Sequence, residues 1–296
     1  MANCHEQFLV FSQALNISPT TKTKLARANV TVREHLKKQC AQMGYPFKRF
    51  KVQGSKQLGT LIRKQGEESD IDIGVYFYPK PSMAPESLMK AVHRFFANGH
   101  QTRTQPELKK RCVRVPYAGR FHIDLPIYYL ESLRGRGKAY LATREEWVKN
   151  DPREFEDWFA QRGGPDRVQL IRIVRYLKAW CHHIADGRRV PQGVALTTLG
   201  GQLFKAHLRD DEALLFVLKA MDKRLSESWS CSMPVHPHDE LLRKISIPDR
   251  EHFLLQLKLF SADAQRAVRA RSRAQACTFW KNHFGRHFPV VNRLSN

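Results

Sequence analysis

The sequence predicts an α+β protein of two lobes, a helix-flanked mixed β-sheet followed by a helical lobe, with an active-site cleft between them. Strand-like runs are concentrated in the first half of the chain, and helical periodicity dominates after about Leu133. The length of 296 residues and a hydrophobic content of 42% suffice for two cores. We therefore expect a sheet-bearing lobe with an N-terminal helix over residues 1–132 and a helical lobe over residues 133–296. A cleft between two such lobes is a common place for a ligand.

The first half begins with a helix and continues with strands. Ser18-Pro19 is a helix start signal, and apolar residues keep helical spacing from there to about Gly44. A helix is also expected at Pro85–Ala97, between the second and third strands. Four runs are predicted as strands: Phe47–Gln53, Asp70–Tyr78, Arg111–Tyr117 and Arg120–Leu130.

The second half is expected to be helical throughout. The segment Asp166–Ile184 places a stripe of apolar residues on one helical face, which predicts a buried face. This stripe consists of Val168, Ile171, Val174, Leu177 and Cys181. Further helices are expected at Leu196–Leu208, Ala213–Leu225, Arg250–Phe260 and Ala262–Phe284.

Composition excludes several classes of protein. Fifty Lys and Arg against 28 Asp and Glu give a formal charge of +22, which predicts attraction to polyanions such as nucleic acid or nucleoside triphosphates. No apolar run approaches the roughly 18–20 residues of a membrane span, and the N-terminal residues lack the positive region of a signal peptide. Six scattered cysteines without a C-x-x-C motif indicate reduced thiols. We therefore expect a cytoplasmic protein without a disulfide framework or a membrane partner.

Three carboxylates form the most informative pattern. Asp70 and Asp72 point to the same face of a strand because side chains alternate, and Asp124 lies in a later apolar strand. If the two strands are neighbours, the three negative charges converge and repel each other unless a cation lies among them. Hard divalent cations with oxygen ligands, Mg²⁺ with Mn²⁺ as a substitute, meet that need. Two such ions can activate a hydroxyl and stabilise a departing pyrophosphate.

A Gly-Ser turn precedes this pattern. Gly54 follows the strand that ends at Gln53 and permits close backbone approach, while Ser55 and the next N–H groups can bind phosphates. The turn lacks the P-loop spacing, and no G-x-G-x-x-G occurs in this region, so P-loop ATPases and dinucleotide-binding folds are disfavoured. A Gly-Ser pair or an Asp-x-Asp is common in surface turns. Their combination with a lone Asp in a later strand is what favours a functional site.

These residues carry a family resemblance. Gly54-Ser55 with Asp70-Ile71-Asp72 and Asp124 resembles the signature of the polymerase-beta-like nucleotidyltransferase superfamily. Three later stretches resemble the bacterial cGAS/DncV-like nucleotidyltransferases (CD-NTases), and the likeness extends from about Phe8 to Pro289. They are Trp147–Phe159, Val174–Trp180 and Phe279–Pro289. The resemblance implies a Mg²⁺-dependent enzyme that joins nucleoside triphosphates into a cyclic di- or trinucleotide. In antiphage signalling of the CBASS type, this second messenger acts on a separate effector.

The resemblance also implies roles for single residues. Asp70 and Asp72 would be metal ligands that position the donor triphosphate, and Asp124 would be the third ligand, close to the acceptor 3′-hydroxyl. Gln53, Gly54 and Ser55 would lie at the donor phosphates, and Lys178 would reach the triphosphate from the helical lobe. Fourteen residues separate Ser55 from Asp70, a wide spacer for this motif.

Two other functions remain open on the residues alone. A linear terminal RNA nucleotidyltransferase or a small-molecule nucleotidyltransferase shares the three aspartates. A non-catalytic nucleic-acid-binding module would be marked by loss of a metal ligand, and all three are present.

Clustered basic residues and histidines allow further interpretations. Arg266, Arg269 and Arg273 are expected on one late helix as a possible surface for activating RNA or DNA, with Arg271 pointing elsewhere. Zinc is not expected, because neither group of possible ligands has an identifiable fourth member. These groups are Cys181-His182-His183 and Cys231 with His236 and His238.

Overall fold

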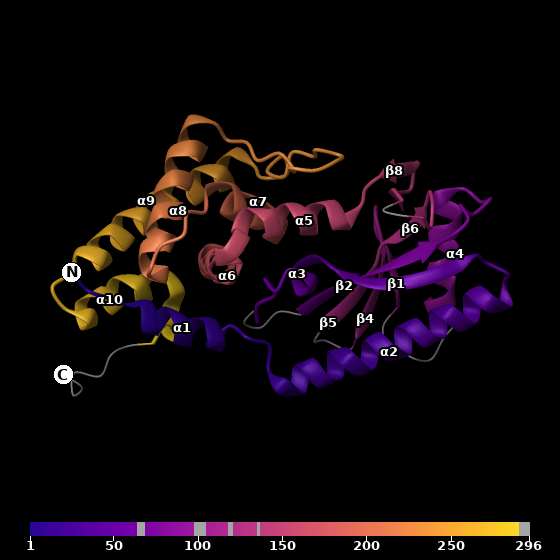
Figure 1. Ribbon diagram of the computed structural model, residues 1–296, viewed down its shortest axis with the longest axis horizontal. Coiled ribbons are helices and arrows are strands. Elements are labelled where there is room, and N and C mark those ends of the chain that lie inside the picture. The colour runs from indigo at the N-terminus through magenta and orange to yellow at the C-terminus, as the bar shows by residue number, and fades with distance from the viewer. Residues whose placement is uncertain (64–68, 98–104, 118–120, 135–136, 290–296) are drawn as a thin grey trace.

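A computed structural model describes residues 1–63, 69–97, 105–117, 121–134 and 137–289 of the chain. Figure 1 shows an elongated molecule with the β-sheet in one half and most of the later helices in the other. The long helix α2 (Pro19–Gln42) runs along the sheet half. The α+β architecture with a mixed sheet and a helical second half is therefore confirmed.

The sheet is built around its central strand, β2. Within the described residues it has eight strands in the order β3-β4-β5-β2-β6-β7-β8, with β1 also paired to β2. β2 pairs in parallel with β5 and β6 and antiparallel with β1. The strands are β1 Phe47–Gln53, β2 Ser69–Phe77, β3 Glu107–Leu108, β4 Val113–Tyr117, β5 Phe121–Leu125, β6 Ile127–Leu130, β7 Ala139–Ala142 and β8 Trp147–Lys149.

Alternation along β2 gives the sheet an apolar face and a polar face. Ile71, Ile73 and Val75 lie in a buried core with α2 and α4 (Pro85–Ala97). Asp70 and Asp72 occupy the opposite face. That face is turned toward α5 (Pro152–Gly163), because Lys51, which pairs with Gly74 on the polar face, forms a 2.6 Å ion pair with Glu156.

The elements predicted for the first half are present except that one strand is divided, and neither β3 nor the helix α1 (His5–Ala14) was predicted. α2 begins after Ser18, whose Oγ accepts a hydrogen bond from the Thr21 amide, and α4 and β1 have the expected bounds. The prediction of a single strand over Arg120–Leu130 is wrong: Arg120 lies outside the described residues, and the rest divides into β5 and β6 at Pro126. Proline has no N–H for the ladder, and the Pro126 carbonyl instead accepts from the Val75 amide at 2.9 Å. Both strands nevertheless pair with β2.

The expectation that everything beyond Leu133 is helical is wrong for residues 139–149. β7 and β8 extend the sheet there, because β7 pairs antiparallel with β6 and β8 with β7.

The N-terminal helix α1 (His5–Ala14) packs through Phe8 and Phe11 into the core of the later helices. The division at residues 132/133 stays a prediction, and the sheet core and the helical core each draw residues from beyond it.

The later helices form a second core around α6. They are α5 Pro152–Gly163, α6 Arg167–Ile184, α7 Gly193–Leu203, α8 Asp210–Glu227, α9 Ile247–Arg269 and α10 Arg273–Phe284. The expected break near Ser261 is wrong, because α9 continues to Arg269 and the break falls at residues 270–272. No helix among the described residues is long and apolar enough to cross a bilayer.

The expected buried stripe of α6 is wrong at its first member. Val168 lies in the first turn and is 66% exposed. The buried surface begins with Leu170 and Ile173 and includes Trp180, because α6 is enclosed by α1, α7, α8 and α10. Val174, Leu177 and Cys181 are buried as predicted.

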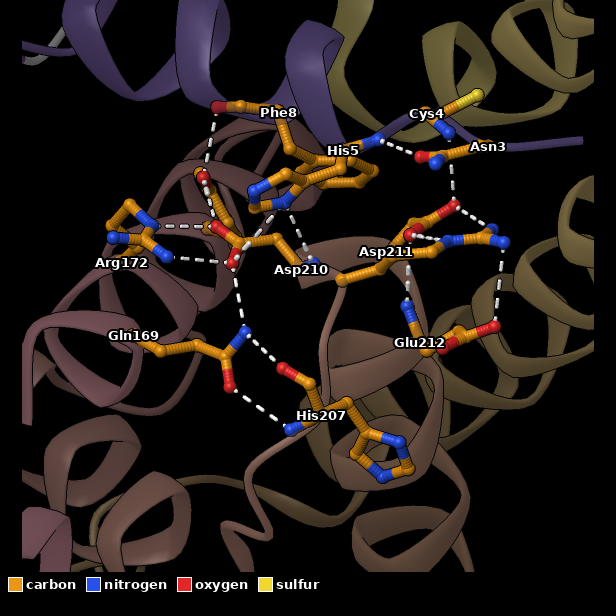
Figure 2. Close-up of polar contacts among 12 residues, drawn as sticks. Asn3, Cys4, His5, Phe8, Gln169, Arg172, His207, Asp210, Asp211 and Glu212 are labelled. Atoms are coloured by element: carbon orange, nitrogen blue, oxygen red, sulfur yellow. Dashed lines mark hydrogen bonds and ion pairs between the residues drawn. The ribbon is translucent and has the colours of Figure 1, made fainter. Parts of the chain in front are cut away.

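A buried polar network attaches the N-terminal residues to the start of α8 (Figure 2). The fully buried Asp210 carboxylate accepts two hydrogen bonds from Arg172, at 2.6 and 2.8 Å, and one from Tyr176. Asp211 accepts from the Cys4 amide, and the Asp210 amide donates to His5 Nδ1. These contacts fix α1 against α6 and α8.

Candidate active site

Strand register brings the three predicted aspartates onto one face of the sheet. In the parallel pairing of β2 with β5, Asp72 lies opposite Asp124 and Asp70 lies opposite His122. Because directly paired residues point to the same face, all four side chains lie on the polar face described above. The condition set by the sequence, that the two strands be neighbours, is met.

Two of the carboxylates have cationic partners that the sequence did not identify. Arg114 of β4 donates to both oxygens of Asp124, from Nε to Oδ1 at 2.8 Å and from Nη2 to Oδ2 at 2.9 Å. This pair is built into the register, because Arg114 lies directly opposite Asp124 in the β4–β5 ladder. His122 Nε2 lies 2.9 Å from Asp70 Oδ1 and forms an ion pair when the ring is protonated.

The third carboxylate, Asp72, lies in an environment that disfavours its charged form. Its pKa is raised from 3.8 to about 7, first by burial and then by the nearby charges of Asp124 and Asp70, with His122 and Arg114 acting in the opposite direction. Burial and two neighbouring carboxylates thus both disfavour the ionised form of Asp72.

Gly54 permits the close approach of the turn to Asp72. Its φ is +66°, and a Cβ atom at this position would lie 2.2 Å from Asp72 Oδ2. Ser55 follows in the short helix α3 (Gly54–Gln57). Gln53 is buried, and its Oε1 accepts a 3.4 Å hydrogen bond from the Tyr128 hydroxyl. Its side chain is thus engaged within the sheet, and its predicted place at the donor phosphates is untested, as is that of Ser55.

Lys178 reaches the Gly-Ser turn from the helical half. The buried ammonium group donates to the carbonyl oxygen of Thr60 at 3.1 Å and to its hydroxyl at 2.9 Å. The Thr60 amide in turn donates to the Ser55 carbonyl at 2.9 Å. Lys178 is therefore linked through Thr60 to the segment that the sequence assigned to phosphate binding.

The chemistry of the aspartates fits a hard divalent cation, since three carboxylates on one face supply oxygen ligands and excess negative charge. Across the described ranges, no three His, Cys, Asp or Glu side chains stand in a metal-holding cluster. The Asp124 oxygens are directed to Arg114 instead. The residue types fit Mg²⁺, which Asp70, Asp72 and Asp124 would hold through their carboxylate oxygens.

The predicted basic surface lies away from these residues and is arranged differently than expected. Arg266 and Arg269 end α9, whereas Arg273 begins α10, so the expectation of a single helix is wrong. Arg271 is as exposed as the others and lies between the helices, which removes the helical argument for treating it as a control. Arg266 also forms a 3.0 Å ion pair with Asp263.

Three contributors were missed by sequence reasoning: Arg114, His122 and Thr60. His122 precedes Asp124 by two residues and shares its face by alternation alone, so the strand pattern could have identified it. Arg114 and Thr60 depend on strand register and on contact between the two halves.

Comparisons with known proteins identify what the aspartate-bearing region resembles. Residues 48–128 match the family model described as "Cyclic GMP-AMP synthase DncV-like, nucleotidyltransferase domain", and this range contains the turn and all three aspartates. A curated cyclic GMP-AMP synthase of Escherichia albertii is 28% identical over 202 residues, covering 64% of this chain and 44% of the relative. A c-di-GMP synthase of Roseivirga ehrenbergii is 27% identical over 221 residues, covering 64% of this chain and 59% of the relative.

A solved structure extends the likeness of fold to almost the whole chain. The crystal structure of the Vibrio cholerae cyclic AMP-GMP synthase DncV superposes with a TM-score of 0.78 at 20% identity, covering 98% of both chains. The chain spans about half the length of the curated relatives it matches.

Proposed function

We propose that the chain is a cGAS/DncV-like nucleotidyltransferase and acts as a cyclic oligonucleotide synthase, on the match of residues 48–128 to the family model and the likeness to a cyclic GMP-AMP synthase. It would join nucleoside triphosphates into a cyclic di- or trinucleotide with release of pyrophosphate. The observation that carries the proposal is the single polar face that holds Asp70, Asp72 and Asp124 beside the Gly54-Ser55 turn. All of these residues lie in the matched nucleotidyltransferase domain.

The three aspartates would hold Mg²⁺, or Mn²⁺ in its place. When bound, the metal supplies neutralisation of the triphosphate and Lewis-acid activation of the attacking hydroxyl. Asp70 and Asp72 would position the donor triphosphate, and Asp124 would assist removal of the proton from the acceptor 3′-hydroxyl. Gly54 lets the backbone of the turn approach this face.

Ser55 and Lys178 would bind the donor phosphates. The position of Lys178 supports this role. Its buried ammonium donates hydrogen bonds to two oxygens of Thr60, and the Thr60 amide donates to the Ser55 carbonyl. An arriving phosphate can replace neutral acceptors at an ammonium, because charge-assisted hydrogen bonds are stronger than neutral ones.

The product would be a second messenger for antiphage signalling that acts on a separate effector in the cytoplasm. Support for a cyclic product comes from two relatives that are cyclic GMP-AMP and c-di-GMP synthases. The antiphage role follows from the family resemblance. A surface of Arg266, Arg269 and Arg273 for activating RNA or DNA is part of the same proposal, supported by their exposure and by the charge of +22.

Pyrophosphate release tests the assignment of the site. The purified protein should release pyrophosphate from a mixture of the four nucleoside triphosphates with Mg²⁺, and the Asp70→Asn/Asp72→Asn double variant should release none while remaining folded. A matched control is Asp263→Asn, since Asp263 pairs with Arg266 in α9 and should leave the rate unchanged. Activity near that of the wild type in the double variant would exclude the proposed mechanism.

A further inference from the structure

The Arg114–Asp124 pair occupies the carboxylate that the proposed function assigns to a metal. The guanidinium engages both oxygens, and the side chains of Arg114 and Asp124 are 28% and 12% exposed. Bidentate Arg–carboxylate pairs are stronger than ordinary hydrogen bonds and fix geometry as well as charge. Asp124 is therefore neutralised and oriented by the protein itself.

This pairing competes with a divalent cation for the same group. A second cation at Asp124 would have to use the remaining lone pairs beside a fixed positive charge, and the repulsion is weakly screened in a partly buried site. Strand register holds the backbone of Arg114 opposite Asp124, so the guanidinium stays within reach of the carboxylate whenever no other cation occupies it.

We propose that Arg114 is an exchangeable counter-ion of Asp124, which neutralises this carboxylate in the metal-free protein and is displaced from it when a divalent cation binds. The inference rests on the proposed function for the identity of Asp124 as a metal ligand. It adds that the Arg114 guanidinium competes with the metal for the Asp124 carboxylate. The strength of the Arg114–Asp124 pair therefore partly sets the affinity of the site for the metal.

Mn²⁺ binding to the 296-residue protein without nucleotides tests this exchange. Free Mn²⁺ is measured by electron paramagnetic resonance during titration of the wild type, Arg114→Gln, Arg114→Lys and the control Arg111→Gln. Arg111 lies three residues away in sequence and pairs with Asp239, so its loss removes a nearby charge without freeing Asp124. Thermal melting in EDTA reports whether each variant folds.

We expect Arg114→Gln to bind Mn²⁺ about ten-fold more tightly than the wild type, equivalent to about 1.4 kcal/mol. Arg114→Lys should also bind more tightly, because lysine keeps the charge but cannot form the two-pronged pair. Arg111→Gln should bind as the wild type does. If Arg114→Gln does not fold, the Mn²⁺ affinity of Arg114→Lys decides the test.

Three results would overturn the exchange. Unchanged affinity in both Arg114 variants would show that the pair does not compete with the metal. Weaker affinity would show that Arg114 orients Asp124 as a ligand. Tighter affinity in Arg114→Gln together with wild-type affinity in Arg114→Lys would show a general charge effect. Because no turnover is measured, these results are independent of whether the product is cyclic.

Discussion

Asp72→Asn is expected to stabilise the metal-free protein at alkaline pH. The Asp72 pKa is raised from 3.8 to about 7, first by burial and then by Asp124 and Asp70. A carboxyl group with a higher pKa in the folded than in the unfolded state contributes full stability below about pH 4, and this contribution is lost as the pH rises through 7. Three pKa units at about 1.4 kcal/mol each give up to about 4 kcal/mol at pH 8. Asparagine keeps the shape and removes the penalty.

Urea unfolding in EDTA measures this gain. The free energy of unfolding of Asp72→Asn should exceed that of the wild type by up to about 4 kcal/mol at pH 8 and by about 2 kcal/mol at pH 5, since the difference follows the two pKa values. Asp124→Asn is the matched control and should be destabilised, because it weakens the bidentate contact with Arg114. A loss of stability in Asp72→Asn at pH 8 would refute the electrostatic account of this face.

Three further substitutions test other parts of the site and surface. Gly54→Ala should lose activity and more than about 1 kcal/mol of stability, measured by urea unfolding, because its φ is +66° and its Cβ would meet Asp72. Lys178→Ala should raise the KM for the donor triphosphate about 10- to 100-fold, because a charged hydrogen bond contributes roughly 1.5–3 kcal/mol. The control Thr60→Val should change this KM far less. An unchanged KM in Lys178→Ala would reject the phosphate role. Charge reversal at Arg266, Arg269 and Arg273 should flatten the slope of log affinity for duplex RNA against log salt, about −0.9 per neutralised phosphate, and should abolish any stimulation of synthesis by RNA at physiological salt. Binding and stimulation equal to those of the wild type would exclude this surface.

Local signals predicted the elements that matter most for the site. The alternation of Asp70 and Asp72 with Ile71 and Ile73 predicted a strand with one polar and one buried face, which β2 has. Ser18-Pro19 predicted the start of α2 because proline fits the first helical turn and the serine hydroxyl caps it. Such predictions succeed because neighbouring residues decide them.

Features that depend on contacts distant in sequence were missed. β7 and β8 are short, and only the pairing of β7 with β6 and of β8 with β7 in the assembled sheet makes them strands. The pairing of Arg114 with Asp124 follows from the β4–β5 register, and that of Lys178 with Thr60 from the packing of α6 on the turn. The division of α9 from α10 was misplaced because alanines and arginines near residue 270 are compatible with a continuous helix.

Product identification tests the central claim most directly. The purified protein is incubated with the four labelled nucleoside triphosphates and Mg²⁺, and the products are treated with phosphatase and identified by mass spectrometry. The proposed function predicts a phosphatase-resistant product with the mass of a cyclic di- or trinucleotide, absent from the Asp70→Asn/Asp72→Asn variant. Products that remain linear and lose their terminal phosphates, or no product at all, would contradict it.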